Sequence, residues 1–463
     1  MSPTSLMTNV TVVTMGPRRE IIEDGAVAWS GSRIVAVGKS AQLRQELPNA
    51  LPFDGEGCLL CPGFVDAHNH SAHFLTKGLL DDVALAERWK TRLYPFECSV
   101  SEEETYWGAV GTYAEQLLHG TTCVGDPGSA YPGSVARAAQ DSGIRIVLSG
   151  TITDTFDPAR PIQGVEEVTA ESVAQYNVLL HEELDGAAEG RIRVAFGLWT
   201  GSTVSDELCI KIRDAAERHD AIIHGHLSTR EADDVESVRR YGYSQVERYH
   251  RLGVLGPRFV GAHAGAISDG DVKILASSGA SITHCPSASM LGGFGCIAHG
   301  RFPELAAANV NLALGSDAAS ISRTLDMPRL MYLAACAHKD VRRDSTVMGA
   351  HLAMEMATIG GARALGLADT IGSIEVGKQA DFVLLRTDGI EWQPRPKFNP
   401  VANLVYSSGG YRADTVVVAG RTVVAKGQLQ TRTLRDLLPQ VRAAAMTAVE
   451  RAGLPQDLVW PIV

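Results

Sequence analysis

Apolar positions in the middle of the chain come in short runs, separated by longer stretches in which apolar residues recur at helical spacing. The helical pattern is clear over Asp206–Arg218 and Asp269–Ser277. A strand followed by a helix, repeated along the chain, predicts a parallel sheet, and about eight such units predict a closed (β/α)8 barrel. The strand-like runs are residues 59–67, 121–125, 193–196, 221–226, 259–263, 280–284 and 311–315.

The two ends of the chain have a different pattern, in which apolar and polar residues alternate over short segments divided by Gly or Asp. Such alternation is typical of half-buried strands. We therefore expect a small β-sandwich domain assembled from residues 1–61 and 372–430, a barrel over 62–371, and a helical segment over 431–463. The alternating segments are 9–15, 25–30, 33–38, 372–377, 380–385, 415–419 and 421–425.

Composition narrows the class of protein. The 463 residues are 45% apolar and 21% charged, which is ordinary for a globular protein, and the length suits a large barrel with an accessory domain. A net charge of −11 disfavours nucleic acid and anionic membranes as partners. Residues 1–16 lack a signal-peptide pattern, and no apolar run reaches membrane-spanning length. We expect a cytoplasmic protein that acts on a small molecule.

The eight cysteines are scattered along the chain and do not predict a disulfide framework. Cys58 and Cys61 form a Cys-x-x-Cys motif, but they lie within an apolar run, and no second pair completes a zinc site. Buried thiols in a reducing compartment are the better interpretation.

The first candidate for chemistry is a pair of histidines at the end of a predicted strand. His68 and His70 are two residues apart, so their imidazoles face the same side of the strand. In a barrel that side is the lumen, and active sites lie where the strands end. Neutral imidazoles there suit a divalent transition metal. Many strands carry two structural histidines, so the pair alone does not decide the question.

Other strand ends strengthen the metal interpretation. His226 closes a second His-x-His motif with His224, His263 closes another run, and Asp317 follows a later one. Polar side chains at the same end of parallel strands converge on one point, and ordinary core histidines do not account for such a set. We expect His224 to lie one layer below His226 and to support the site or its packing.

With these motifs the chain resembles the metal-dependent amidohydrolase superfamily, in its cytosine deaminase, S-adenosylhomocysteine deaminase and triazine hydrolase branch. The resemblance implies metal ligation by His68, His70, His226 and Asp317, with His263 beside the metal-bound water and Asp317 as proton carrier. It also implies a homo-oligomer, dimer or tetramer. The motifs are residues 62–70, 77–82, 226–228, 263, 315–319, 356–366 and 372–385.

The strand over residues 192–197 ends without the Lys or Glu that two-metal members of this superfamily place there. We therefore expect one divalent ion. Three nitrogens and one oxygen suit zinc, and alternatively iron or cobalt.

Two positions depart from the deaminase pattern. Deaminases of this branch read His-x-x-Glu after the fifth strand, but Thr229 stands three residues after His226, and Glu231 is displaced by two positions. Adenosine-type deaminases also carry a histidine in a Pro-His motif where this chain has Trp199. We interpret both changes as favouring an apolar amide-like substrate: a phenylurea, a carbamate, or a thiocarbamate such as molinate. On this profile, phenylurea hydrolase and molinate hydrolase are the members it resembles most.

Apolar and aromatic residues near the strand ends fit that interpretation, and we expect five residues to contact substrate. Within enzymes, the alternative is an aminohydrolase or dechlorinase that acts on a nitrogen heterocycle such as a triazine, purine or pyrimidine. A third hypothesis is a non-catalytic scaffold, which the presence of all four expected ligands argues against. The expected substrate contacts are His73, Phe74, Trp89, Trp199 and Met290.

Overall fold

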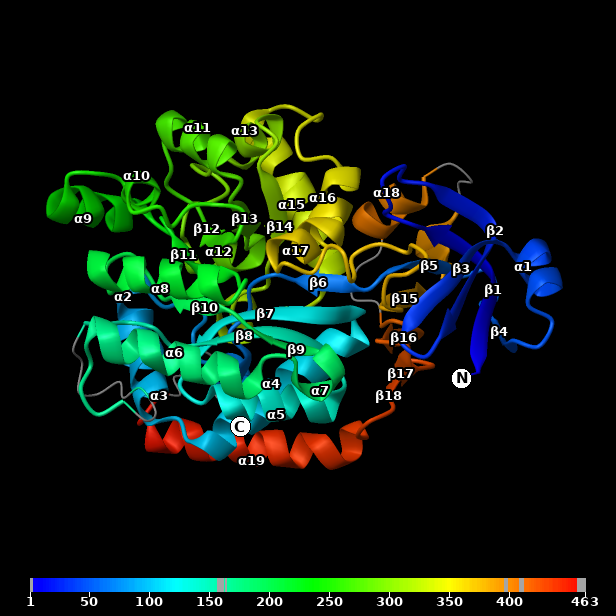
Figure 1. Ribbon diagram of the computed structural model, residues 1–463, viewed down its shortest axis with the longest axis horizontal. Helices are drawn as coiled ribbons and strands as arrows, with labels where there is room; N and C mark the ends of the chain where they lie inside the picture. The colour runs from blue at the N-terminus through cyan, green and yellow to red at the C-terminus, as the bar shows by residue number, and fades with distance from the viewer. Residues whose placement is uncertain (1–2, 156–161, 163–164, 395–398, 408–411, 456–463) are drawn as a thin grey trace, which may run out of the picture.

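A closed barrel of parallel strands forms the larger part of the molecule (Figure 1). The computed structural model describes residues 3–155, 162, 165–394, 399–407 and 412–455. The barrel strands form two hydrogen-bonded sets. The first is β6 (Phe64–Asp66), β7 (Thr121–Ser129), β8 (Arg145–Gly150) and β9 (Ile192–Val194). The second is β10 (Phe196–Leu198), β11 (Ile223–Leu227), β12 (Phe259–His263), β13 (Ser281–His284) and β14 (Asn311–Leu314).

Two backbone contacts turn these sets into one barrel. β9 and β10 are one strand interrupted at Ala195, whose N–H donates to the Leu148 carbonyl at 2.8 Å. On the opposite side the Ala67 N–H, just after β6, donates to the Leu314 carbonyl of β14 at 2.8 Å. The predicted (β/α)8 barrel is thereby confirmed. The strand at β8 was not expected from the sequence.

Helices follow the strands and cover the barrel (Figure 1). α8 begins and ends at the residues expected for it, because Ser205 accepts the Leu208 N–H at 3.1 Å as a cap and the apolar face is buried. The main helices are α4 (Glu102–Leu118), α5 (Pro132–Ser142), α6 (Ala170–Leu184), α8 (Asp206–Arg218), α9 (Glu231–Tyr241), α10 (Gln245–Arg251), α11 (Asp269–Ser278), α15 (Met327–Arg342) and α19 (Leu434–Arg451).

Shorter helices connect the main elements, and several of them surround the carboxyl ends of the barrel strands. They are α1 (Ser40–Glu46), η1 (Ser71–Thr76), α2 (Leu85–Arg88), η2 (Trp89–Leu93), α3 (Tyr94–Ser99), α7 (Ala187–Gly190), α12 (Pro286–Gly292), α13 (Phe302–Ala307), α14 (Ala319–Ser322), α16 (Ala350–Met356), α17 (Ile359–Ala364), η3 (Ile390–Trp392) and α18 (Pro400–Tyr406). In the part of the chain that the structure describes, no helix combines the length and apolar character needed to cross a membrane.

The remaining strands form the expected additional β domain, built from both ends of the chain and set beside the barrel (Figure 1). The two ends meet where β5 and β15 pair antiparallel, with Cys61 opposite Val383. All nine strands belong to one connected sheet. They are β1 (Thr4–Val13), β2 (Ile21–Ser30), β3 (Arg33–Lys39), β4 (Leu51–Asp54), β5 (Leu59–Pro62), β15 (Phe382–Leu385), β16 (Thr415–Val418), β17 (Arg421–Ala425) and β18 (Gln428–Leu429).

The apolar run over residues 59–67, which we expected to be one barrel strand, is divided between the two parts. β5 belongs to the β domain and β6 to the barrel, with Gly63 between them. A Cβ at Gly63 would lie 2.2 Å from side-chain atoms of Thr122, so only glycine lets the chain pass this close to β7. Cys58 and Cys61 are buried free thiols, as predicted.

A buried ion pair joins the β domain to the barrel. Arg145, at the start of β8, donates from Nε and Nη2 to the two carboxylate oxygens of Asp381, at 3.1 and 3.0 Å. Nη2 also donates to Gln379 Oε1 at 2.6 Å. Both charged side chains are only 1% exposed. Burial disfavours the charged guanidinium, but the Asp381 carboxylate outweighs this effect and raises the pKa of Arg145.

We expect Gly108→Ala to destabilise the protein, although alanine is the better helix former by about 1 kcal/mol. α4 packs closely on η1, and a Cβ at Gly108 would lie 2.5 Å from the Ala72 carbonyl oxygen. Moving η1 would also displace His70, the residue before it. Thermal unfolding should give a lower Tm for Gly108→Ala, whereas Gly133→Ala on α5, with no atom within 4 Å, should leave it unchanged or higher. An unchanged Tm in Gly108→Ala would contradict the close packing.

Candidate active site

Four histidines and an aspartate from four barrel strands meet at the carboxyl ends of those strands, with His68 and His70 both following β6. The Nε2 atoms of His70 and His226 are 3.2 Å apart. Asp317 Oδ1 lies 3.5 Å from His70 Nε2 and 4.0 Å from His68 Nε2, and its Oδ2 lies 3.9 Å from His263 Nε2. The structure thus brings together all five residues that the sequence predicted, and we call them the histidine centre.

The donor atoms of the histidine centre fit a divalent metal ion. His68 Nε2 is buried, and among the described residues it has no hydrogen-bond partner. Burial and the neighbouring imidazoles hold the pKa of His68 and His70 well below the ordinary value, so both rings are neutral and have a lone pair to offer. Imidazole nitrogens and one carboxylate suit zinc, and alternatively iron or cobalt.

Neighbouring groups orient two of these imidazoles. His226 Nδ1 donates to the Trp199 carbonyl at 2.5 Å, which leaves its Nε2 lone pair facing the centre. His68 Nδ1 lies 3.0 Å from His224 Nε2, and both side chains are buried. His224 therefore has the supporting position that the sequence predicted for it.

We expect His224→Ala to weaken metal binding by about 10- to 100-fold, because residues that orient a ligand typically have effects of that size. The side chain holds the His68 ring in place without reaching the centre itself. Competition with a chelator of known affinity measures the metal Kd directly. His250→Ala, an exposed histidine on α10, is the matched control and should bind as the wild type does. Equal metal affinity in both variants would contradict the supporting role.

The backbone at Asp317 and His263 is in the left-handed region, with φ of 58° and 80°. Such conformations cost free energy for residues other than glycine, and at a functional site they persist because the surrounding contacts hold them. The Asp317 N–H donates to the His68 carbonyl at 2.8 Å, and Asn69 Nδ2 donates to the Asp317 carbonyl at 2.6 Å. Burial raises the pKa of Asp317 to about 7, against an opposing hydrogen bond from the Ala318 N–H.

The sequence interpretation overlooked a buried carboxylate beneath the centre. Asp66 accepts the Ser316 N–H at 2.9 Å and the Gln116 amide at 2.8 Å, and so ties the His68 loop to the Asp317 loop. The sequence could have pointed to Asp66, because this residue lies in the same motif as His68 and is the last residue of β6.

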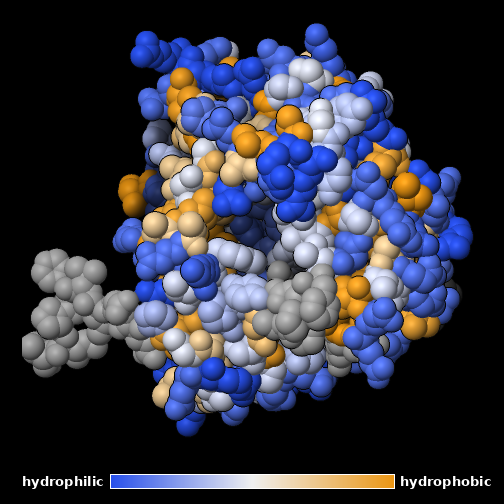
Figure 2. Space-filling view, turned by 90° about the vertical axis from the view of Figure 1, so that its left-hand side faces the viewer, coloured by the Kyte–Doolittle hydropathy of each residue, from blue (hydrophilic) through white to orange (hydrophobic). Residues whose placement is uncertain are grey.

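A cavity of about 480 Å³ opens over the histidine centre, within the size range of small-molecule sites. We call it the main cavity. Figure 2 faces the left-hand side of Figure 1 and shows a hollow near the middle of that face, with hydrophilic residues inside it. Three of the predicted substrate contacts line the main cavity, namely His73, Trp89 and Trp199. Phe294 also lines it, 5.7 Å between ring centroids from His263.

Two predicted substrate contacts lie elsewhere. The Phe74 ring packs against α4, where a Cβ at Gly111 would lie 2.6 Å from the ring, because η1 turns Phe74 toward that helix. Met290 is on α12 with 53% of its surface exposed, and it does not line the main cavity. Phe74 and Met290 both lie close to strand ends in the sequence, but the short helices η1 and α12 turn their side chains away from the main cavity.

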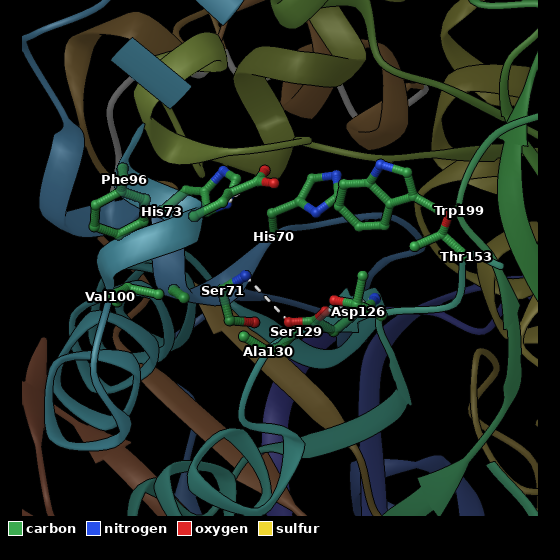
Figure 3. Close-up of a pocket in the computed structure, with 14 residues that line it drawn as sticks. His70, Ser71, His73, Phe96, Val100, Asp126, Ser129, Ala130, Thr153 and Trp199 are labelled. Carbon is green, nitrogen blue, oxygen red and sulfur yellow. Dashed lines mark hydrogen bonds and ion pairs between the residues drawn. The ribbon is translucent and has the colours of Figure 1, made fainter. Parts of the chain in front are cut away.

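A side pocket adjoins the main cavity next to His70 (Figure 3). Asp126 lies in it and accepts the N–H groups of Ser71 and Gly128, both at 3.1 Å, so its carboxylate holds the backbone on two sides of the pocket. Burial raises the pKa of Asp126 to about 6. Near the pocket, His73 Nε2 lies 3.4 Å from Glu97 Oε1, a carboxylate that the sequence interpretation did not single out.

Two acidic residues, Glu231 and Asp233, follow His226 in the sequence, and only one of them reaches the main cavity. Thr229 lines the main cavity, whereas Glu231 is exposed on the first turn of α9. Asp233 lines the cavity, but its oxygens accept the Arg230 N–H at 3.0 Å and the Arg230 guanidinium at 2.9 Å. Glu231 therefore does not stand in for the glutamate of the deaminase pattern.

Comparisons with known proteins agree on the family. Residues 59–423 match the amidohydrolase family. A 5-methylthioadenosine/S-adenosylhomocysteine deaminase of Syntrophobacter fumaroxidans is 31% identical over 96% of this chain and 98% of its own. A 5'-deoxyadenosine deaminase of Methanothermobacter thermautotrophicus is 33% identical over 95% and 99%.

A solved structure extends the comparison to three dimensions. The structure of an adenosine deaminase from Xanthomonas campestris with bound zinc has a TM-score of 0.88 and 29% identity, over 97% of this chain and 99% of its own. These relatives support the heterocycle alternative better than the expected resemblance to phenylurea or molinate hydrolase. The chain belongs to the amidohydrolase family, and it is a metal-dependent hydrolase of carbon–nitrogen bonds.

Proposed function

We propose that the protein is an aminohydrolase that replaces an amino group on a nitrogen heterocycle, of the adenine-nucleoside type, with oxygen from water. The carrying observation is that relatives named as adenine-nucleoside deaminases match it over nearly their whole length, while the same chain brings the histidine centre under the main cavity. Trp89 and Trp199 offer apolar faces for a flat ring in that cavity.

In this proposal His68, His70, His226 and Asp317 hold one divalent ion. When bound, such an ion acts as a Lewis acid and lowers the pKa of a coordinated water from 15.7 to about 7. Asp317 accepts a proton from the attacking water and returns it to the leaving nitrogen. The water oxygen bonds to the ring carbon, the carbon–nitrogen bond breaks, and ammonia leaves. His263 donates a hydrogen bond to the oxygen as it adds, an effect worth about 3–4 kcal/mol.

A panel of compounds tests this function. Zinc-loaded protein is incubated with S-adenosylhomocysteine, 5'-deoxyadenosine, an aminotriazine, an aryl urea and a thiocarbamate, and the released ammonia, amine or thiol is measured. We expect ammonia from one or more of the heterocycles. Release of amine or thiol from the urea or thiocarbamate, without ammonia from any heterocycle, would overturn the proposal.

A specific observation favours a second candidate, the hydrolysis of an apolar amide-like carbonyl such as a phenylurea, carbamate or thiocarbamate. A ring nitrogen must gain a proton during deamination, and Thr229 stands where the deaminase pattern has a glutamate. An acyclic carbonyl needs no such proton donor, and the aromatic lining suits it equally. The same panel separates the two candidates by their leaving groups.

Thr229 itself gives a prediction. Its hydroxyl is too weak an acid to protonate a ring directly, so we expect Thr229→Ala to keep kcat within about 10-fold of the wild type, below the effect of a general acid. Steady-state kinetics on the best substrate of the panel checks this. A loss of 1000-fold or more would give the threonine a direct part in positioning the proton donor. We also expect a dimer or tetramer, which light scattering on purified protein tests.

A further inference from the structure

The ionisable side chains that line the main cavity are almost all paired with one another. Glu97 lies beside His73, Asp233 binds Arg230, and Asp317 belongs to the histidine centre. Arg88 is the exception among the described residues, because no carboxylate oxygen lies within 4 Å of its guanidinium. Its nearest acidic neighbours act only at longer range, and one of them, Asp81, lies 3.5 Å from Arg323.

The hydrogen bonds of Arg88 are also incomplete. Nη2 donates to the carbonyls of Leu291 and Val83 at 3.1 and 3.3 Å, which anchors the side chain between α12 and the segment before α2. Nε is buried without a hydrogen-bond partner among the described residues, and no described group accepts from Nη1. A guanidinium carries five N–H donors, so most of its capacity is unused.

Arg88 is nevertheless a buried residue, with only 4% of its surface exposed. Two other buried arginines have carboxylate partners: Arg145 binds Asp381, and Arg248 lies 2.8 Å from Asp206. Arg191 is buried as well and donates to the carbonyls of Ala139 and Ile144, but it does not line the main cavity. Burial lowers the pKa of Arg88, whereas the pKa of Arg145 and of Arg248 is raised. A buried cation without a counter-charge is costly, and an anion that enters the cavity would relieve that cost.

We propose that Arg88 is a specificity residue that binds an anionic group of the substrate, a carboxylate or a phosphate, through the donors it leaves unused. The inference rests on the proposed function in one respect. It takes the anionic group to be part of the same substrate molecule whose ring reaches the histidine centre. The side chain lines the same cavity as that centre, so one molecule can contact both.

Benzoate and benzamide test the charge preference, because they share a shape and differ in charge. Their Kd values for zinc-loaded protein are measured by calorimetry in the wild type, in Arg88→Gln and in Arg230→Gln. We expect the wild type to bind benzoate at least 10-fold more tightly than benzamide. Arg88→Gln should weaken this preference, and Arg230→Gln, which removes an arginine already paired with Asp233, should keep it at the wild-type value. Phenylphosphonate, run in parallel, distinguishes a phosphate-binding site from a carboxylate-binding one.

Binding of benzoate to the metal is common to all three proteins, so the comparison isolates Arg88. No preference in the wild type, or an equal preference in Arg88→Gln, would overturn the proposal and leave Arg88 as a structural anchor. If Arg88→Gln does not fold, Arg88→Met replaces it, because it also removes the positive charge, and an unchanged preference for benzoate over benzamide there would overturn the proposal as well. Neither probe is a deaminase substrate, so a benzoate preference without ammonia release would count against the proposed function alone.

Discussion

Asp317→Asn should lower kcat by about 100- to 10 000-fold while the protein stays folded and keeps most of its metal. An amide can still offer an oxygen to a cation, but it cannot take a proton from water and return it to a leaving nitrogen, and proton transfer of that kind is worth this much. The backbone contacts that hold residue 317, the Asn69 and His68 hydrogen bonds, do not depend on the carboxylate.

The measurement pairs steady-state kinetics with metal analysis of the same sample. Asp220→Asn, an aspartate whose side chain is 88% exposed, is the control and should behave as the wild type does. A kcat within 10-fold of the wild type in metal-loaded Asp317→Asn would show that another group carries the proton. Loss of the metal together with activity would instead assign Asp317 a role in ligation that outweighs proton transfer.

Arg145→Met should lower the free energy of unfolding by about 3–5 kcal/mol, because it leaves the Asp381 carboxylate buried without its counter-charge. Arg145 and Asp381 are each 1% exposed and make two hydrogen bonds with one another. The pair joins β8 of the barrel to the start of β15 in the β domain, because Asp381 directly precedes β15. Unfolding in denaturant measures this loss of stability as a shift of the transition midpoint to a lower denaturant concentration.

The chain offers a matched control for this pair. Arg421 and Glu189 also bridge the β domain and the barrel, at 2.7 Å, but their side chains are 62% and 72% exposed. Exposed pairs contribute little, so Arg421→Met should leave the midpoint almost unchanged. An equal effect of the two substitutions would mean that burial does not set the strength of the Arg145 pair.

The barrel and the histidine centre could be predicted because each depends on local patterns repeated along the chain. Apolar strands predict lumen-facing positions, and polar residues at their ends must then converge. His68, His226, His263 and Asp317 are each such a strand end. The β domain was predictable for the same reason, since alternation marks its strands at both ends of the chain.

The substrate contacts could not be predicted equally well, because they depend on how short helices leave the strands. Phe74 and Met290 are close in sequence to strand ends, but η1 and α12 turn them toward a helix and toward solvent. Arg88 and Glu97 lie on α2 and α3, further from any strand, and only the fold brings them to the main cavity. The division of residues 59–67 also needed the fold, because Gly63 marks it only through its contact with Thr122.

The most direct test of the account is deamination in water enriched in heavy oxygen. Zinc-loaded protein is given S-adenosylhomocysteine and 5'-deoxyadenosine, and both ammonia and the labelled product are measured, with His68→Ala as the metal-site control. The account predicts ammonia and one labelled oxygen on the purine ring with the wild type, and neither with His68→Ala. Labelled oxygen recovered only in the carbonyl product of a urea or thiocarbamate, with both nucleosides unchanged, would contradict it.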